Sequence, residues 1–178
     1  MWPGLENIQD SGARSRLVSY LESLERWRSR INLTGAGDRA AVFATLVAPI
    51  LGAEVLLSGR VVDVGSGNGS PGLVLASLRP DLSFVLLEPR AKRWAFLREA
   101  AREMGATNVE VERKRSDEYR GDPAETVTIR AVGLSPEHLR PLLGPHGGCV
   151  VVFGGPALEQ TETVLLGGGG RVQRRCFT

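Results

Sequence analysis

The stretch Arg60-Val61-Val62-Asp63-Val64-Gly65-Ser66-Gly67-Asn68-Gly69-Ser70-Pro71-Gly72 decides the fold of this chain. The apolar run before Gly65 predicts a buried strand. The glycines that follow predict a tight turn, because glycine accepts a positive φ and lets a ligand approach the backbone closely. Pro71 suits the first position of a helix, where its missing N–H has no cost. A strand, a glycine turn and a helix in this order predict a ligand site at the turn.

The segments after this turn alternate between strand and helix patterns. Short apolar or alternating runs predict four further strands, at residues 83–87, 109–112, 126–129 and 148–153. A helix is predicted from about residue 90 to 104, closed by Gly105, and another begins at Ser135. This alternation predicts an α/β fold with a doubly wound, mostly parallel Rossmann-like sheet and helices on both faces. Ligands of such sheets bind at the carboxyl ends of the strands.

The segment before the first strand is predicted to be helical. Asp38 is a candidate N-cap for a second helix that would run through Leu51. Apolar residues at three- and four-residue steps predict an earlier helix with one buried face, formed by Leu17, Tyr20, Leu21, Leu24, Trp27 and Ile31. With 178 residues the chain fits one core, so we predict a single domain over 1–178, with a helical cap at 1–58 and an α/β core at 59–178.

The C-terminal end does not follow this pattern. Gly167–Gly170 is followed by only eight residues, which predicts a hairpin turn or a weakly ordered tail. We therefore expect the last strands of the sheet to be shortened or absent. Cys149 lies in an apolar run and is interpreted as a small core residue, and its spacing from Cys176 matches no metal or redox motif. No metal site is expected.

The composition is that of a soluble globular protein, with 42% hydrophobic and 24% charged residues. No apolar run approaches the roughly 20 residues of a membrane-spanning helix. The N-terminus lacks the pattern of a signal peptide. We therefore predict a cytoplasmic protein with no membrane association, and a monomer.

The basic residues are almost all arginines. Of the 22 Lys+Arg residues only Lys92 and Lys114 are lysines, which leaves 20 arginines, while the net charge is only +2. A GC-rich genome would produce this bias. Contact with phosphate groups would also favour it, because a guanidinium group binds phosphate through two hydrogen bonds. The sequence leaves both explanations open.

Two nucleotide ligands compete for the glycine turn. Residues 67–72 match the G-x-G-x-x-G pattern of dinucleotide binding, for which Glu88 has near the expected spacing. S-adenosylmethionine is favoured for two reasons: Asp63 extends the pattern to D-x-G-x-G-x-G, and the chain is too short for the second half of a dinucleotide fold. In either case the Glu88 carboxylate would accept hydrogen bonds from ribose hydroxyls. The predicted cradle consists of Asp63, Gly65, Ser66, Gly67 and Gly69.

Five segments, read together and in order, resemble one known family. These are residues 30–34 (Arg-Ile-Asn-Leu-Thr), 62–73, 86–97, 115–119 (Arg-Ser-Asp-Glu-Tyr) and 128–132 (Thr-Ile-Arg-Ala-Val). They resemble the RsmG family, also called glucose-inhibited division protein B, which methylates N7 of a guanine in bacterial 16S ribosomal RNA. The resemblance extends over roughly residues 17–153. It implies a class I methyltransferase sheet, S-adenosylmethionine as cofactor, and ribosomal RNA or the small ribosomal subunit as partner.

The resemblance also implies roles for individual residues. Cofactor contacts would fall on Gly65, Ser70 and Arg130, with Glu88 at the ribose and Ser116 and Asp117 beside the adenine. Asn32, Thr34 and Arg130 would face the reacting guanine or the methionine end of the cofactor, which makes these three the candidate catalytic residues.

Each of these roles has a structural alternative. Asn32 and Thr34 would cap a turn between two helices. Arg130 would pair with Asp63 or Glu88. Asp117 would be an ordinary carboxylate in a first helical turn.

The chain departs from the family at two places. The family carries an Arg-His pair and a nearby Asp in the second helix, whereas residues 42–49 are Val-Phe-Ala-Thr-Leu-Val-Ala-Pro. The family ends its fifth strand in Lys-Gly, and this chain has Phe153-Gly154-Gly155. These losses suit a divergent member with another substrate, or a cofactor-binding protein that does not turn over. An NAD(P)-dependent reductase is the remaining alternative.

Overall fold

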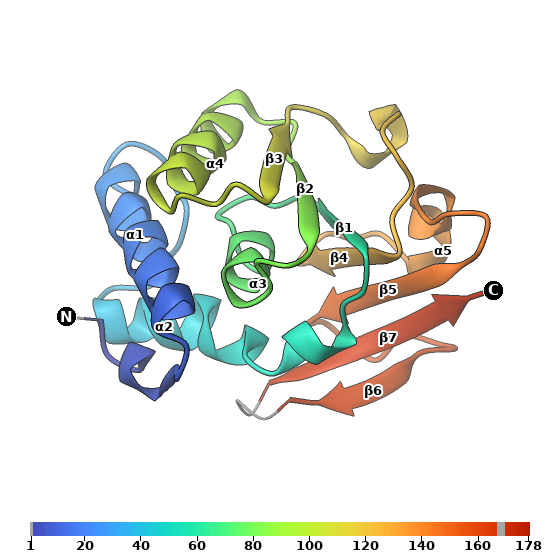
Figure 1. Ribbon diagram of the computed structural model, residues 1–178, viewed down its shortest axis with the longest axis horizontal. Helices are drawn as coiled ribbons and strands as arrows, with labels where there is room; N and C mark the ends of the chain where they lie inside the picture. The colour runs from blue at the N-terminus through green and yellow to red at the C-terminus, as the bar shows by residue number, and fades with distance from the viewer. Residues whose placement is uncertain (1, 167–169) are drawn as a thin grey trace.

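A twisted sheet of seven strands forms the centre of the molecule (Figure 1). The structure, a computed structural model, describes residues 2–166 and 170–178. The strand order is β3-β2-β1-β4-β5-β7-β6. The first five strands are parallel, and β7 runs antiparallel to both β5 and β6. The strands are β1 (Arg60–Val64), β2 (Ser83–Leu87), β3 (Val109–Glu112), β4 (Thr126–Arg130), β5 (Gly148–Phe153), β6 (Glu162–Leu165) and β7 (Arg171–Phe177).

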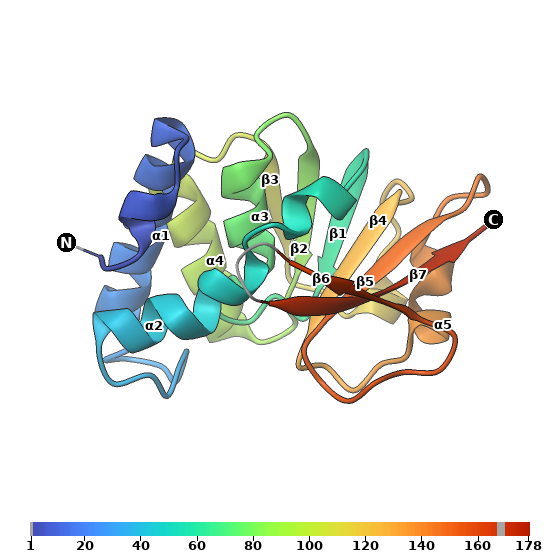
Figure 2. The same ribbon diagram turned by 90° about the horizontal axis from the view of Figure 1, so that it is seen from below.

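The two faces of the sheet are covered unequally (Figure 2). One face packs under three helices in the larger apolar cluster, α1 (Ser11–Trp27), α3 (Gly72–Leu78) and α4 (Ala91–Glu103). The other face is covered by short elements, α5 (Pro136–Leu139) and the 3-10 helices η4 (Ser116–Glu118) and η5 (Arg140–Leu142). The prediction of a mostly parallel Rossmann-like sheet with helices on both faces is confirmed.

The long N-terminal helix α1 has the predicted buried face. Its N-cap Asp10 accepts a hydrogen bond from the backbone of Ala13, and Tyr20 is fully buried in the helix centre. The helix ends at Trp27, so Ile31 lies beyond it in the following loop rather than on its apolar stripe. A one-turn 3-10 helix, η1 (Leu5–Asn7), precedes it.

The second helix, α2 (Arg39–Leu46), begins where it was predicted and ends early. The side chain of Asp38 accepts a hydrogen bond from Ala41 N at 2.8 Å, which confirms Asp38 as the N-cap. The prediction that the helix continues through Leu51 is wrong. Pro49 has no N–H to donate and Gly52 has φ +93°, so the chain continues as two 3-10 helices, η2 (Ala48–Ile50) and η3 (Ala53–Leu56).

Residues 39–56 also bear on the expectation that no segment suits a membrane. By length and mean hydropathy, 1.6 over 18 residues, this helical stretch is apolar enough to cross one. In this structure it is divided into α2, η2 and η3, and 28% of it is buried within the protein.

The prediction that the C-terminal strands are shortened is wrong. Strand β7 has seven residues and pairs with β5 over six of them, and its Val172 and Gln173 are buried. The hairpin partner β6 then completes the sheet. The predicted glycine turn at 167–169 lies outside the described residues. Three of the seven residues of β7 are arginines, at 171, 174 and 175, so its sequence resembles a solvated tail.

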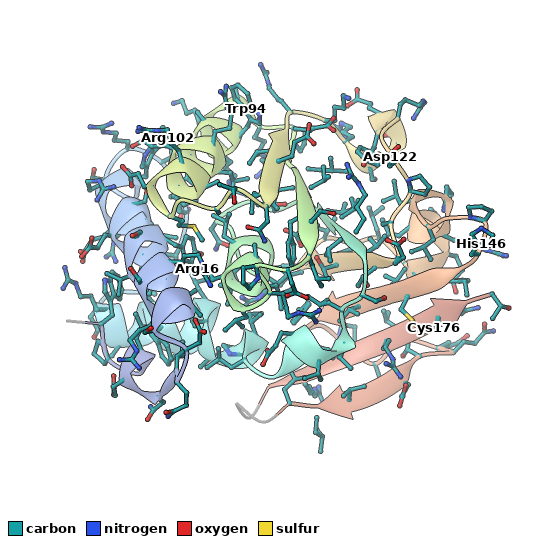
Figure 3. The ribbon with its side chains drawn as sticks, in the orientation of Figure 1. Arg16, Trp94, Arg102, Asp122, His146 and Cys176 are labelled. Atoms are coloured by element: carbon teal, nitrogen blue, oxygen red, sulfur yellow. A yellow bond between two sulfur atoms is a disulfide. The ribbon has the colours of Figure 1, made fainter. Side chains whose placement is uncertain are left out.

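The interpretation of Cys149 as a small core residue is also wrong. Cys149 on β5 lies opposite Cys176 on β7 in the antiparallel register, and the two form a disulfide (Figure 3). Neither side chain is buried. The disulfide depends on the register between β5 and β7, and the sequence analysis did not predict that these two segments pair.

Candidate active site

Two adjoining cavities open over the carboxyl ends of β1, β2 and β4, where the chain order of the sheet reverses. The first has a volume of about 600 Å³ and the second about 680 Å³. They share four lining residues: Gly65, Pro89, Val132 and Gly133. The sheet topology therefore brings the glycine turn, the end of β2 and the end of β4 around one crevice, as the sequence predicts.

The glycine turn holds its shape through hydrogen bonds to β2. Gly65 N and Ser66 N both donate to Leu87 O, at 2.9 and 3.1 Å. Gly65 has φ +70°, and a Cβ built there would lie 2.6 Å from Cγ2 of Val132. Only glycine fits this position, since any side chain would meet both a strained backbone and the wall of the crevice.

Asp63 lies beneath the turn rather than in the crevice. Its carboxylate is fully buried, and its Oδ1 accepts a hydrogen bond from Thr128 Oγ1 at 2.6 Å. Burial raises the pKa of Asp63 to about 6, and the hydrogen bond from Thr128 opposes this rise. The absence of a side chain at Gly72 leaves space for the Asp63 carboxylate, because a Cβ at Gly72 would lie 2.6 Å from Asp63 Oδ2. Asp63 lines neither cavity, so it supports the turn from below instead of meeting a ligand there.

Glu88 places a buried carboxylate in the wall of the first cavity. Only 3% of the residue is exposed. Its Oε2 accepts from Gly67 N at 3.0 Å and its Oε1 from Arg90 N at 2.8 Å. These two backbone donors fix the carboxylate, and each oxygen keeps a lone pair for a ligand hydroxyl.

Arg130 bridges three elements across the first cavity. Its Nη1 donates to Ser70 Oγ and its Nη2 to the backbone oxygen of Thr45, both at 2.6 Å. Burial lowers the pKa of this guanidinium from its ordinary value. The alternative that Arg130 pairs with Asp63 or Glu88 is wrong: within residues 2–166 and 170–178 it has no carboxylate within 4.0 Å.

The backbone turns sharply just after Arg130. Ala131 has φ +53°, a conformation that costs a non-glycine residue about 1 kcal/mol or more. Both cavities are lined by the next residues, Val132 and Gly133. Ala131 itself lines the first cavity, so the strained residue directly precedes the segment that the two cavities share.

The remaining turn residues have mainly structural contacts. Ser66 is buried and its hydroxyl donates to Asp63 O at 3.0 Å. Ser70 Oγ donates to Leu46 O at 2.7 Å while accepting from Arg130. A Cβ on Gly69, which has φ +90°, would lie 2.9 Å from the ring of Tyr20.

The two predicted substrate-facing residues before α2 are placed differently from each other. Thr34 lines the first cavity, and its Oγ1 accepts from Ala36 N at 3.2 Å, which is the turn-capping role given as its alternative. Asn32 is exposed and is not among the lining residues, and its backbone oxygen accepts from Arg93 Nη2 at 3.3 Å. The structure thus brings Thr34, but not the Asn32 side chain, to the cavity.

The second cavity has a more apolar lining. Ser116 and Asp117 of η4 contribute polar groups to its lining, together with the apolar side chains of Val64, Leu87 and Leu142. Such a slot suits a flat apolar ring with polar edges.

Three residues of the site are not among the predicted site residues. Tyr20 O–H donates to the backbone oxygen of Asn68 at 2.8 Å, and burial raises the pKa of the Tyr20 phenol so that it stays protonated. Asn68 and Arg93 both line the first cavity. In the sequence Tyr20 is only one more residue of an apolar stripe, and nothing there places α1 against the turn. In the described part of the chain, no group of three His, Cys, Asp or Glu side chains lies close enough to hold a metal ion.

Comparisons with known proteins agree with this geometry. The profile of the GidB family, described as rRNA small subunit methyltransferase G, matches residues 13–163. A ribosomal RNA small subunit methyltransferase G from Halorhodospira halophila is 37% identical over 158 residues, which cover 84% of this chain and 75% of that protein. The protein of that name from Leifsonia xyli subsp. xyli is 37% identical over 157 residues, covering 86% and 68%.

Among solved structures, the fold is similar to a precorrin-6y C5,15-methyltransferase from Geobacter metallireducens. The TM-score is 0.50 at 20% identity, over 69% of this chain and 64% of that one. This likeness concerns the fold alone.

Proposed function

Because this chain belongs to the GidB family of rRNA small subunit methyltransferase G proteins, we propose that it transfers a methyl group from S-adenosylmethionine to N7 of a guanine in 16S ribosomal RNA. The observation that carries the proposal is the pair of adjoining cavities around the glycine turn, with the buried Glu88 carboxylate in the wall of the first.

The residues present fit S-adenosylmethionine. Glu88 would hold the ribose hydroxyls, since its oxygens accept and are already oriented by backbone N–H groups. Gly65 and Gly67 keep the turn free of side chains where the cofactor would lie. The second cavity, with Ser116 and Asp117 in its lining, would take the adenine. When bound, the cofactor supplies an electrophilic methyl group on a positively charged sulfur.

The chemistry needed from the protein is modest. Guanine N7 carries an in-plane lone pair and no proton, so its methylation needs no general base. Catalysis can come from holding the nucleophile in line with the methyl group, which is worth several kcal/mol. The first cavity suits this role. Among its lining residues the titratable side chains are Glu88, Arg90, Arg93 and Arg130, and backbone donors already hold both Glu88 oxygens.

Unpaired cations at the mouth of the first cavity support an RNA partner. Arg90 and Arg93 line this cavity, Lys92 lies between them at the start of α4, and Arg28 and Arg30 belong to the loop after α1 that leads to the lining residues Leu33 and Thr34. None of these five forms an ion pair with a described carboxylate. Guanidinium groups without carboxylate partners are available to RNA phosphates.

The departures from the family keep a second function open, a cofactor-binding protein that does not turn over. Where the family has polar side chains in the second helix, this chain offers the backbone oxygens of Thr45 and Leu46, which hold Arg130 and Ser70. Where the family ends its fifth strand in Lys-Gly, this chain has Phe153-Gly154-Gly155, and both glycines are exposed. We propose that the backbone contacts of Arg130 replace the lost polar groups, so that turnover is retained.

A transfer assay separates the two functions. The protein is incubated with tritiated S-adenosylmethionine and small ribosomal subunits from cells that lack this methylation, and the label is mapped by strand cleavage selective for N7-methylguanine. Label at one guanine of 16S RNA is expected. Measured cofactor binding without label in any ribosomal RNA would reject the methyltransferase and favour the binding protein.

The proposal also covers the location, the oligomeric state and the domain organisation of the protein. We propose a cytoplasmic monomer that acts on the small subunit or its RNA. We also propose that residues 1–178 act as one domain, because one apolar cluster joins Leu17 and Leu21 of α1 to Phe84 and Leu86 of the sheet.

A further inference from the structure

The loop between α1 and α2 carries both predicted substrate-facing residues, Asn32 and Thr34, and its position is set by other elements. Leu33, between them, is only 5% exposed and packs in the larger apolar cluster. The backbone oxygens of Asn32 and Leu33 each accept a hydrogen bond from the cofactor half of the molecule, from Arg93 and Asn68.

Asn68 makes the more direct of these two connections. It lies inside the glycine turn, and its Nδ2 donates to Leu33 O at 3.0 Å. Its Oδ1 accepts from Ser70 N at 3.1 Å within the same turn. Its backbone oxygen accepts from Tyr20 O–H at 2.8 Å, which anchors the turn to α1.

This arrangement requires an amide side chain. One group must donate to a carbonyl of the loop while another accepts from an N–H of the turn, and at this size only asparagine offers both. An aspartate would keep the acceptor for Ser70 and lose the donor for Leu33.

From these contacts we infer that Asn68 is a positioning residue that fastens the loop of Asn32 and Thr34 to the cofactor turn. The inference rests on the proposed function, in which the turn binds S-adenosylmethionine and the loop meets the guanine. Anything that fixes the turn then also fixes the loop. Because coupling between two binding sites is reciprocal, bound cofactor tightens RNA binding and bound RNA tightens cofactor binding by the same factor.

The first test needs no RNA. Amide hydrogen exchange is followed over residues 33–36 with and without S-adenosylhomocysteine, in the wild type and in Asn68→Asp. In the wild type, the ligand should slow exchange in both the turn and the loop. In Asn68→Asp it should slow exchange in the turn alone. Equal protection of the loop in both proteins would overturn the inference.

The second test measures the coupling itself. The affinity for S-adenosylhomocysteine is measured by calorimetry with and without the RNA substrate, and KM for RNA is measured separately from kcat. Asn68→Asp should raise KM for RNA about fivefold, the effect of losing one hydrogen bond of ordinary strength. It should also abolish the coupling, so that the affinity of the variant for S-adenosylhomocysteine is the same with and without RNA, whereas RNA tightens binding in the wild type. A loss confined to cofactor affinity would show that Asn68 contacts the cofactor and does not tie the loop.

The chain offers a matched control in Asn108. Its side-chain amide also donates to backbone oxygens, those of Arg79 and Leu82 at 3.2 and 3.0 Å, away from both cavities. Asn108→Asp makes the same chemical change and should leave KM for RNA and loop exchange unaltered. If Asn68→Asp does not fold, Asn68→Ser, which adds no charge and cannot reach the loop, replaces it in both tests.

The two hypotheses fail in distinguishable ways. If the wild type methylates no RNA, the proposed function fails, and the exchange experiment still decides the role of Asn68. If the wild type methylates RNA and Asn68→Asp behaves as Asn108→Asp does, only the role of Asn68 is lost.

Discussion

Substitution of the buried Asp63 by asparagine should change how the stability of the protein depends on pH. Burial raises the pKa of this carboxyl group in the folded state from its ordinary 3.8 to about 6. The folded protein therefore binds the proton more tightly than the unfolded chain does. For an acid shifted in this direction, stability is greatest at low pH and falls as the pH rises through the window from about 4 to 6.

The magnitude follows from the size of the shift. A difference of about two pKa units corresponds to about 3 kcal/mol of unfolding free energy over the full window. Roughly 2 kcal/mol of this lies between pH 4.5 and pH 7.5. The amide that replaces the carboxyl group in Asp63→Asn is neutral at both pH values, so the substitution removes this dependence. Any change in the strength of the hydrogen bond between Thr128 and the asparagine side chain alters the stability of the variant by the same amount at both pH values.

Urea unfolding followed by tryptophan fluorescence at pH 4.5 and pH 7.5 measures the effect. The difference in the free energy of unfolding between Asp63→Asn and the wild type should shift by about 2 kcal/mol in favour of the variant when the pH is raised from 4.5 to 7.5. The control is Asp81→Asn: Asp81 is exposed, and its hydrogen bond with Arg79 lowers its pKa below 3.8, so its effect on stability changes only below the assay range and that substitution should show almost no difference between pH 4.5 and pH 7.5. A difference between Asp63→Asn and the wild type that is the same at both pH values would refute the reasoning.

Three further tests address the site and the sheet. Arg130→Ala should reduce methyl transfer about a hundredfold, because the guanidinium spans the crevice, while circular dichroism and the urea midpoint stay near wild type; undiminished transfer would contradict its role. Gly65→Ala should weaken S-adenosylhomocysteine binding about tenfold by calorimetry, since its Cβ would strain a backbone at φ +70° and press on Val132; unchanged affinity would show that the turn does not hold the cofactor. Reducing the Cys149–Cys176 disulfide, which spans 27 residues, should lower stability by about 3 kcal/mol in a thermal or urea melt; an identical melt with and without reductant would mean that the two thiols are not paired.

The parallel core of the fold follows from short-range signals in the sequence. Strands β1, β2 and β5 are buried apolar runs between glycine, proline or charged residues, and such runs predict strands without knowledge of their partners. The position of Glu88 at the end of β2 then places it beside the turn, because neighbouring parallel strands end at the same edge.

The C-terminal hairpin lacks signals of that kind. Strand β7 is half exposed and rich in arginine, and its pairing with β5 joins residues that lie between 19 (Phe153 and Val172) and 29 (Gly148 and Phe177) positions apart in the chain. The disulfide depends on the same register, so neither the strand nor the bond could be predicted from local pattern. Helix α2 ends early for a local reason, Pro49, which the periodicity of the surrounding apolar residues concealed.

The part of the site that could be predicted from the sequence is the part formed by the glycine turn and the neighbouring end of β2. Gly65 and Glu88 have the predicted places, but Asp63 is buried below the turn and Asn32 does not line the cavity. The missed contacts are long-range. Tyr20 meets Asn68 across 48 residues, and Arg130 meets the backbone of Thr45 across 85. Contacts to backbone oxygens leave no mark on the sequence, because any residue supplies that acceptor.

A crystal structure with S-adenosylhomocysteine tests the central claim most directly. We predict that the ribose hydroxyls lie on Glu88, with the adenine in the second cavity between Ser116 and Val132 and the homocysteine end over Gly65. Ligand density elsewhere on the protein, or soaked crystals in which the Glu88 carboxylate contacts no ribose, would contradict it.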